Sequence, residues 1–435
     1  MRIYNTLSKK IEEFESIGET VGIYTCGPTV YDYMHIGNLR TFLLADVFER
    51  ALRFDGYKLK TVQNITDIDD KIIRKANDRG IGIAELSQEF EKFFKEDITK
   101  VNILPKDENP HATTYITKMQ DYILELIKKG FAYVEKDGSV YFDISEFKAY
   151  GKLSGIEAAS LKTGTRVLSD EYSKDDVQDF ALWKGEEKDQ IGWASPWGWG
   201  RPGWHIECSV MSQENLGDTI DVHMGGIDLV FPHHENEIAQ SEAKTGKQFV
   251  KYWIHGAHIL VDGKKMSKSL GNFYRLKDVT DKGIDPLALR YLYLQTHYRQ
   301  EMNFTWEALE AAQTALGKLR KKYADSVSGN GELPSEFKEA ISDDLNLPRA
   351  LAVVWENIDS LSRESLDKID ELLGLNLSAK EEEVEIPTEI QELVDEREAF
   401  RKSGNYEEAD RVRNDIEEKG FILEDSKDGI KIRKN

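Results

Sequence analysis

The strongest constraint on the fold comes from residues 21–48, where a short apolar run meets a turn and then an amphipathic segment. Val21–Tyr24 is apolar and indicates a buried strand. Gly27-Pro28 ends that strand and begins a turn. From about Gly37, apolar residues recur at helical spacing: Leu39, Phe42, Leu43, Val47 and Phe48. The sequence therefore predicts a strand, a glycine-containing loop and a helix, as in an α/β fold.

Such a unit is suited to holding a phosphate group, because the backbone N–H groups at the start of a helix point into the preceding loop. His35 and Asn38 add side-chain donors there, and Gly37 lets a ligand approach the backbone closely. Cys26 stands at the end of the strand, where parallel sheets hold their ligands. By themselves, residues 35–38 are equally compatible with an ordinary turn.

A second segment changes this balance. Lys265-Met266-Ser267-Lys268-Ser269 places two lysines in a small-residue loop after the strand-like run Ala257–Val261, although alone it is also compatible with a solvated basic turn. Together and in this order, the two segments resemble the signature motifs of class I aminoacyl-tRNA synthetases. The resemblance implies that ATP binding and catalysis involve His35, Asn38, Lys265 and Lys268. Asn38 replaces a more common histidine, and its amide can still donate to a phosphate oxygen.

Composition sets limits on the class of protein. A chain of 435 residues is long enough for two to four domains. Its two cysteines exclude a disulfide scaffold and favour the cytoplasm. No apolar run is long enough to span a bilayer, and the first residues lack a signal-peptide pattern, so we expect no membrane contact. The formal net charge of −21 argues against binding nucleic acid by overall positive charge, so local basic patches would have to do so.

The pattern along the chain predicts an α/β Rossmann-type catalytic domain with an inserted connective domain, mainly α-helical domains after it and a small α/β end. A second strand is expected at Lys58–Asn64, with Thr66 or Asp67 capping the helix that follows. The α/β pattern is expected to resume around Phe180–Lys184. The expected division is a catalytic domain in two halves (1–112 and 171–260), an insertion (113–170), a signature-loop and helical stem-contact region (261–324), a helical bundle (335–378) and a C-terminal anticodon-binding domain (388–435).

The second cysteine lies in a segment rich in possible metal ligands. If a helix begins near Pro232, His233 and Glu237 are four residues apart and share one face. With Cys26 and Cys208 they make a set of two thiolates, an imidazole and a carboxylate, which suits zinc. Each cysteine is also compatible with an ordinary core position. Spacing alone leaves three other histidines as alternative ligands: His205, His223 and His234.

Residues 64–71, 200–209 and 225–240, with the Cys26 stretch, resemble the cysteinyl-tRNA synthetase family, and the likeness runs over essentially the whole chain. The resemblance implies one zinc ion per chain on the floor of the amino-acid pocket, with ligands at Cys26, Cys208, His233 and Glu237. It also implies substrate contacts from Thr66, Trp204 and Asp228. Since zinc binds a thiol far more readily than a hydroxyl, whereas an apolar pocket separates them poorly, we expect no editing domain.

The same resemblance implies tRNA contacts near the end of the chain, at Arg401, Asp410 and Asp425, with Tyr406 at an aromatic position. Ile432 departs from the family pattern, in which Trp is common, and isoleucine has no π-face on which a base can stack. A solvated helical hairpin is the alternative interpretation of this region.

The implied reaction joins L-cysteine to ATP, which carries Mg²⁺, and then transfers the cysteinyl group to the 3′ end of tRNA(Cys). We expect a cytoplasmic, monomeric enzyme. The main alternative is a ligase that joins activated cysteine to an amino-sugar; it would share the zinc set and both motifs but would need no region like 388–435. A non-catalytic paralogue is disfavoured by the intact lysines, and a small nucleotidyltransferase by the length of the chain.

Overall fold

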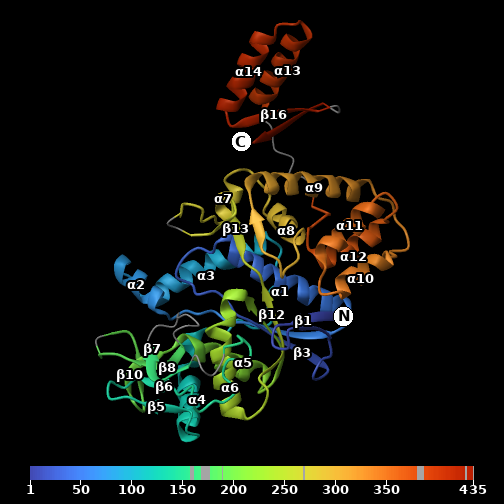
Figure 1. Ribbon diagram of the computed structural model, residues 1–435. Coiled ribbons are helices and arrows are strands. Elements are labelled where there is room, and N and C mark those ends of the chain that lie inside the picture. The colour runs from blue at the N-terminus through green and yellow to red at the C-terminus, as the bar shows by residue number, and fades with distance from the viewer. Residues whose placement is uncertain are drawn as a thin grey trace.

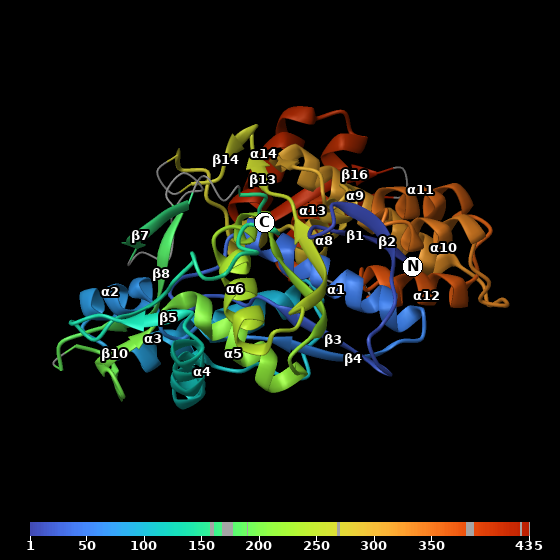
Figure 2. The same ribbon diagram turned by 60° about the horizontal axis from the view of Figure 1, so that its bottom comes forward.

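The protein is organised around a four-stranded parallel sheet with the strand order β12-β11-β3-β4. The computed structural model describes residues 1–156, 161–167, 177–188, 190–267, 270–379, 387–426 and 429–434. Its parallel strands are β3 (Thr20–Thr25), β4 (Lys58–Gln63), β11 (Ile220–Gly226) and β12 (Val250–Gly256). Figure 1 labels β3 and β12, and Figure 2 shows β4 beside β3. The predicted strands at Val21–Tyr24 and Lys58–Asn64 are confirmed, as is the helix from about Gly37, which is α1 (Ile36–Phe54).

The order of the strands determines where a ligand can enter. From β3 the chain passes outward to β4, whereas from β11 it passes to β12 on the other side. In an open parallel sheet, ligands bind where this direction reverses, beyond the carboxyl ends of the two central strands. Cys26 directly follows β3, and Asp228 comes two residues after β11. The topology thus places these two segments at one edge of the sheet.

The helix after β4 begins later than the sequence suggested. This helix, α2 (Asp70–Arg79), is capped by Asp69, whose side chain accepts a hydrogen bond from the N–H of Lys71 at 2.6 Å. The prediction of Thr66 or Asp67 as the cap was wrong, because Asp67 accepts from the N–H and hydroxyl of Thr113 instead. Two further helices follow, α3 (Ile83–Lys100) and α4 (Ile116–Lys128).

The insertion carries its own sheet, in which β5-β6-β8-β10-β9 are neighbours and β7 also pairs with β8. The run Phe180–Lys184 lies in β8, which pairs antiparallel with β6 and β10. The parallel sheet therefore does not resume there, and the insertion sheet continues to Pro202. The strands are β5 (Ala132–Val134), β6 (Val140–Phe142), β7 (Leu161–Val167), β8 (Val177–Gly185), β9 (Trp193–Ser195) and β10 (Gly198–Pro202).

Beyond β10, two helices pack beside the parallel sheet, α5 (Trp204–Leu216) and α6 (His233–Thr245). Since α6 begins directly after Pro232, the condition for His233 and Glu237 to share one face is met. A three-stranded sheet then connects the second signature motif to the body. Its strands are β13 (Ile259–Val261), β14 (Lys264–Lys265) and β15 (Met302–Phe304). A short hairpin of β1 (Arg2–Asn5) and β2 (Lys10–Glu13) precedes the whole domain.

The remaining part of the chain is mainly helical, as predicted. Its helices are α7 (Leu276–Thr280), α8 (Pro286–Leu294), α9 (Trp306–Asp325), α10 (Ser335–Ser342), α11 (Leu347–Asn357), α12 (Arg363–Leu373), α13 (Thr388–Lys402) and α14 (Tyr406–Glu418). The last two helices and the hairpin of β16 (Phe421–Ser426) and β17 (Gly429–Lys434) share a small core of their own, at the top of Figure 1. The strand β17 was not predicted.

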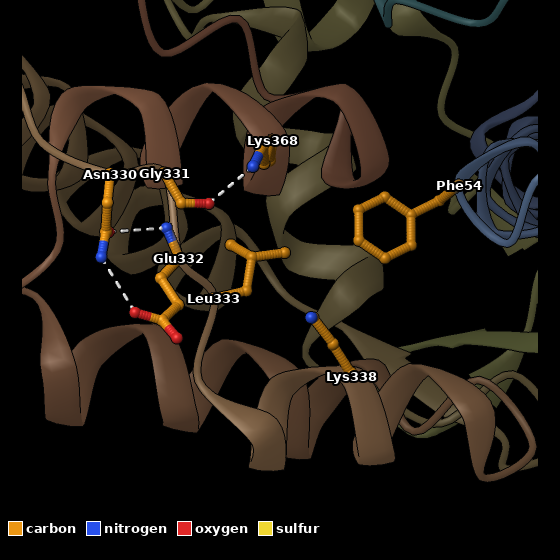
Figure 3. Close-up of a pocket in the computed structure, with 7 residues that line it drawn as sticks. All are labelled: Phe54, Asn330, Gly331, Glu332, Leu333, Lys338 and Lys368. Atoms are coloured by element: carbon orange, nitrogen blue, oxygen red, sulfur yellow. Dashed lines mark hydrogen bonds between the residues drawn. The ribbon is translucent and has the colours of Figure 1, made fainter.

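A buried ionic network joins α1 to the helical bundle. Arg290 of α8 is fully buried, lies 2.5 Å from Asp46 of α1, and donates to the carbonyl of Leu373 at the end of α12. Nearby, a cavity of about 540 Å³ separates Phe54 from the bundle (Figure 3). Some of its polar groups bond to one another, for example Lys368 to the carbonyl of Gly331. Since Phe54 ends α1, this cavity lies roughly 28 Å from the signature residues at the start of the helix.

Candidate metal and nucleotide site

Four predicted ligands from three parts of the chain meet beyond the carboxyl end of β3. One ligand atom from each of Cys26, Cys208, His233 and Glu237 lies within 4.8 Å of the others, and all four residues are buried. The two sulfur atoms are 3.9 Å apart, and Cys26 Sγ is also 3.9 Å from Glu237 Oε1. The turn spacing of α6 brings His233 Nε2 to 3.1 Å from the same oxygen. This arrangement can enclose a metal ion.

The fit to a cation is supported by an unsatisfied atom. Among the described residues His233 Nε2 makes no hydrogen bond of acceptable geometry, although it is buried and lies 3.1 Å from Glu237 Oε1. Burial raises the pKa values of the Cys26 and Cys208 thiols above their usual range. It also raises the pKa of Glu237 to about 8 and lowers that of His233 to about 3. Burial thus favours the neutral form of every ligand. A bound dication would offset that cost by stabilising thiolates and a carboxylate.

The three alternative histidines lie around this set. His223 Nε2 is 2.9 Å from Glu237 Oε2, and His234 Nε2 is 3.3 Å from Cys26 Sγ. Cys26, His223, His234 and Glu237 therefore form a second compact group. The two groups share Cys26 and Glu237. His223 and His234, the alternative ligands of the second group, therefore contact the shared ligands and hold them in place. His205 contacts His233 through its Nδ1 atom at 3.0 Å.

A buried chain of hydrogen bonds connects the two cysteine segments. The N–H of Gly27 donates to Asn64 Oδ1, and Asn64 Nδ2 donates to the hydroxyl of Thr66. That hydroxyl donates to Glu207 Oε2 at 2.9 Å. Gly27 follows Cys26 and Glu207 precedes Cys208, so the chain fixes one ligand segment relative to the other. Neither Asn64 nor Glu207 was predicted, and only their positions beside predicted site residues could have indicated them.

At the first signature motif, His35 and Asn38 form a capping box at the start of α1. His35 Nδ1 accepts from the N–H of Asn38, and Asn38 Oδ1 accepts from the N–H of His35. A neutral ring that accepts at Nδ1 carries its proton on Nε2, so Nε2 is a donor. The amide of Asn38 is fixed in the same way, with its oxygen toward the cap. Both side chains therefore have a defined orientation beside the helix N-terminus.

The second signature motif begins in the hairpin of β13 and β14. Lys265 is exposed at the end of β14. Asn272 holds the loop after it, since its side chain accepts from the N–H of Ser267 at 2.8 Å and donates to the carbonyl of Lys265 at 3.2 Å. Lys268, the other predicted lysine, lies outside the described residues.

The three predicted substrate contacts differ in their exposure and in how they are placed relative to the metal ligands. Trp204, at the start of α5, stacks on His233 with ring centroids 4.0 Å apart. Asp228 is exposed just beyond β11, in a short 3-10 turn (Ile227–Val230). Thr66 is buried, and its hydroxyl takes part in the chain described above.

The predicted tRNA contacts lie in the C-terminal unit. Arg401 is exposed in the last turn of α13, and Asp410 is exposed on α14. Asp425 belongs to β16 and pairs through its backbone with Ile430. Tyr406 is 66% exposed, as a surface contact requires. Ile432 instead packs against the small core of this unit, which accounts for an aliphatic residue at that position.

The helices of the described residues include none with both the length and the apolar character needed to cross a membrane.

Comparison with known proteins relates this geometry to a family. The family model for the catalytic domain of class I (C) tRNA synthetases matches residues 13–314. A cysteine--tRNA ligase from Chlamydia felis is 44% identical over 99% of this chain and 97% of its own length. Another from Protochlamydia amoebophila is 41% identical over 100% of this chain and 98% of its own.

Solved structures support the fold. A methionyl-tRNA synthetase of Mycobacterium tuberculosis in complex with methionyl-adenylate superimposes with a TM-score of 0.57 at 14% identity, covering 88% of this chain and 85% of the other. The LeuRS of Agrobacterium radiobacter in a ternary complex gives 0.58 at 12% identity, over 82% and 83% of the two chains. The family model and the full-length relatives show that the chain belongs to the cysteine--tRNA ligase family of class I aminoacyl-tRNA synthetases.

Proposed function

We propose that this protein activates L-cysteine with ATP and transfers the cysteinyl group to tRNA(Cys), the reaction named for its relatives. One observation carries the proposal. Four buried ligand atoms lie within 4.8 Å of one another at the carboxyl end of β3, and the loop from that point leads directly to the capping box of α1. Cys26, one of the four ligands, is thus nine residues before His35, the N-cap of α1, on one edge of the sheet.

The proposed metal is a single zinc ion per chain, held by Cys26, Cys208, His233 and Glu237. The donor set fits, since it combines sulfur, imidazole and carboxylate ligands. When bound, zinc would favour an ionised substrate thiol over a hydroxyl, which is the chemical difference between cysteine and serine. The protein's part is to keep the ligands converging, through the contacts of His223 with Glu237 and of His234 with Cys26.

For the first step, the cysteine carboxylate attacks the α-phosphorus of ATP and the bond to the departing pyrophosphate breaks. We propose that Nε2 of His35, Nδ2 of Asn38 and the start of α1 donate to the phosphates. Lys265 would neutralise charge that develops in the transition state, with Mg²⁺ carried by ATP. The same role for Lys268 rests on its place in the second signature motif alone. Positioning and charge neutralisation supply most of the catalysis in such a step.

The roles proposed for the three pocket residues follow from the contacts that each side chain already makes and from those that it can still make with a substrate. Trp204 would form a wall, because its indole already lies flat against His233. Asp228 is exposed at the edge of the sheet and would accept the substrate ammonium. The hydroxyl of Thr66 donates to Glu207 and accepts from Asn64, which leaves one lone pair for a substrate donor.

In the second step, a ribose hydroxyl at the 3′ end of tRNA takes the cysteinyl group. The proposed anticodon contacts are Arg401, Asp410 and Asp425, supported by exposure of the first two on neighbouring helices. The proposed active form is a monomer. Both cysteines are free thiols, which fits the reducing cytoplasm as its location.

Cysteine-dependent exchange of pyrophosphate into ATP, with metal analysis on the same sample, tests the proposal. Wild-type protein should contain one zinc ion and should prefer cysteine strongly to serine. Cys208→Ser should lose most of its metal and most of that preference. Ser212→Ala is the matched control, since Ser212 is buried one turn along α5 and its hydroxyl donates to the carbonyl of Ser209 in the same helix. A metal-free Cys208→Ser protein with an unchanged preference would contradict the role of the metal.

Charging of tRNA separates this function from the amino-sugar alternative, which the comparisons do not support. The cysteine--tRNA ligases match this chain over nearly its whole length, including the C-terminal unit that an amino-sugar ligase would not need. Cysteine-dependent exchange without transfer to tRNA(Cys) would favour the alternative.

A further inference from the structure

Arg40 lies on α1, five residues after His35, and its side chain is almost fully buried. Its guanidinium donates four hydrogen bonds, and all four acceptors are backbone carbonyls: Ala257 at 2.9 Å, His258 at 2.9 Å, His297 at 3.2 Å and Gln300 at 2.8 Å. Burial lowers the pKa of Arg40 to about 10. Since a buried cation is costly, such a group needs every one of these partners.

The first two acceptors are the residues that join β12 to β13. From this junction the chain runs directly into the β13–β14 hairpin, which carries Lys265. The other two acceptors lie in the turn after α8, which is itself bonded to the junction through the N–H of Ala257 and the carbonyl of Tyr298. Arg40 therefore fixes the point at which the second signature segment leaves the parallel sheet.

The other end of the same segment is also attached to the first turn of α1. The N–H of Ile36 donates to the carbonyl of Tyr274 at 2.9 Å, and the ring of His35 meets that of Phe273 edge to face, with centroids 5.0 Å apart. Tyr293 from α8 donates to the carbonyl of Ile36 at 2.6 Å. The residues that enter and leave the second signature segment are thus both bonded to the first two turns of α1, which carry or directly follow the first motif.

We propose that Arg40 is a positioning residue, which holds the two phosphate-binding motifs in register by clamping the base of the β13–β14 hairpin to the start of α1. The metal centre depends on β3, α5 and α6 instead, so it should be insensitive to this clamp. The inference rests on the proposed function, because the register matters only if both motifs bind one nucleotide. A misplacement of about 1 Å in such a site can lower a rate by about 10²-fold.

The test compares Arg40→Lys with Arg50→Lys. Lysine keeps the charge but cannot reach four carbonyls with one ammonium group. Arg50 is the matched control: it lies on the same helix, is also buried, and donates to the carbonyls of Glu371 and Asn102, but it holds the helical bundle. Both variants should be less stable, so activity is measured well below their melting temperatures and per folded molecule.

Arg40→Lys should lower kcat of pyrophosphate exchange at least 10-fold, with zinc content and the KM for cysteine within twofold of wild type. Hydrogen exchange should increase in β13, β14 and at Ile36. Arg50→Lys should change kcat less than threefold. In this variant, backbone hydrogen exchange should increase near residues 101–104 and 371–374 instead. Equal kcat losses in the two variants, or loss of zinc from Arg40→Lys, would overturn the inference. Absence of cysteine-dependent exchange in the wild type would overturn the proposed function instead, since hydrogen exchange still reports on the clamp.

Discussion

The hydroxyl of Thr66 gives the most discriminating test of how the site is built. It was predicted as a substrate contact, yet it is the middle link between Asn64 and Glu207. Thr66→Val keeps the shape and removes the hydroxyl, so Asn64 Nδ2 loses its acceptor and Glu207 Oε2 loses this donor. Thr66→Ser keeps both hydrogen bonds and deletes only a methyl group.

The structure sets the expected magnitudes. A buried polar group that loses its partner costs about 1–3 kcal/mol, and two groups are affected here, which places the loss in Thr66→Val at about 2–6 kcal/mol. The buried methyl group deleted in Thr66→Ser is worth about 1 kcal/mol. Because the chain of bonds connects Gly27 with Glu207, the valine variant should also bind zinc more weakly, by about tenfold, the lower end of what loss of an outer-shell partner usually costs.

Urea unfolding and a zinc competition titration with a chromogenic chelator measure both quantities. If Thr66 served the substrate alone, the two variants would be similarly stable, zinc affinity would be unchanged in both, and only the KM for cysteine would rise in Thr66→Val. That result would refute the structural reading of this hydroxyl.

Two further predictions concern single residues. In Gly27→Ala, an added Cβ would lie 1.6 Å from the carbonyl oxygen of Asn64, so the segment beside Cys26 must shift and the zinc content should fall. Gly82→Ala is the control and should keep its zinc, because among the described residues the added Cβ meets no atom within 4 Å. Burial raises the pKa of Asp97 to about 6, so the stability associated with its protonated form is lost as the pH rises from about 4 through 6. Asp97→Asn should therefore stabilise the protein by about 1 kcal/mol more at pH 8 than at pH 5 in urea unfolding, a value reduced for partial exposure; equal effects at both pH values would contradict this.

Local sequence patterns predicted those helices and strands in which each face is clearly either buried or exposed. The strand before Cys26 and the helix after His35 follow from apolar spacing, and the start of α6 follows from Pro232. The run Phe180–Lys184 was misassigned because burial on both sides gives the same continuous apolar sequence in an insertion sheet as in a parallel one. The cap of α2 was missed because Asp67, an equally good candidate, is used by Thr113 from a distant segment.

The candidate site, too, was predicted in part from local spacing, whereas the rest of it depends on contacts between segments far apart in the sequence. Helical spacing could pair His233 with Glu237, but it could not choose among His205, His223 and His234, since all of them surround the same point. The positions of these rings are set by the packing of α5 and α6 against the sheet, which brings His234 Nε2 close to the sulfur of Cys26 and His233 Nε2 close to Glu237 Oε1. Arg40 was missed for a related reason: its partners are carbonyls, and a backbone carbonyl is the same in every residue, so no sequence pattern marks them. Residues that organise a site through backbone contacts are therefore visible only once the fold brings those segments together.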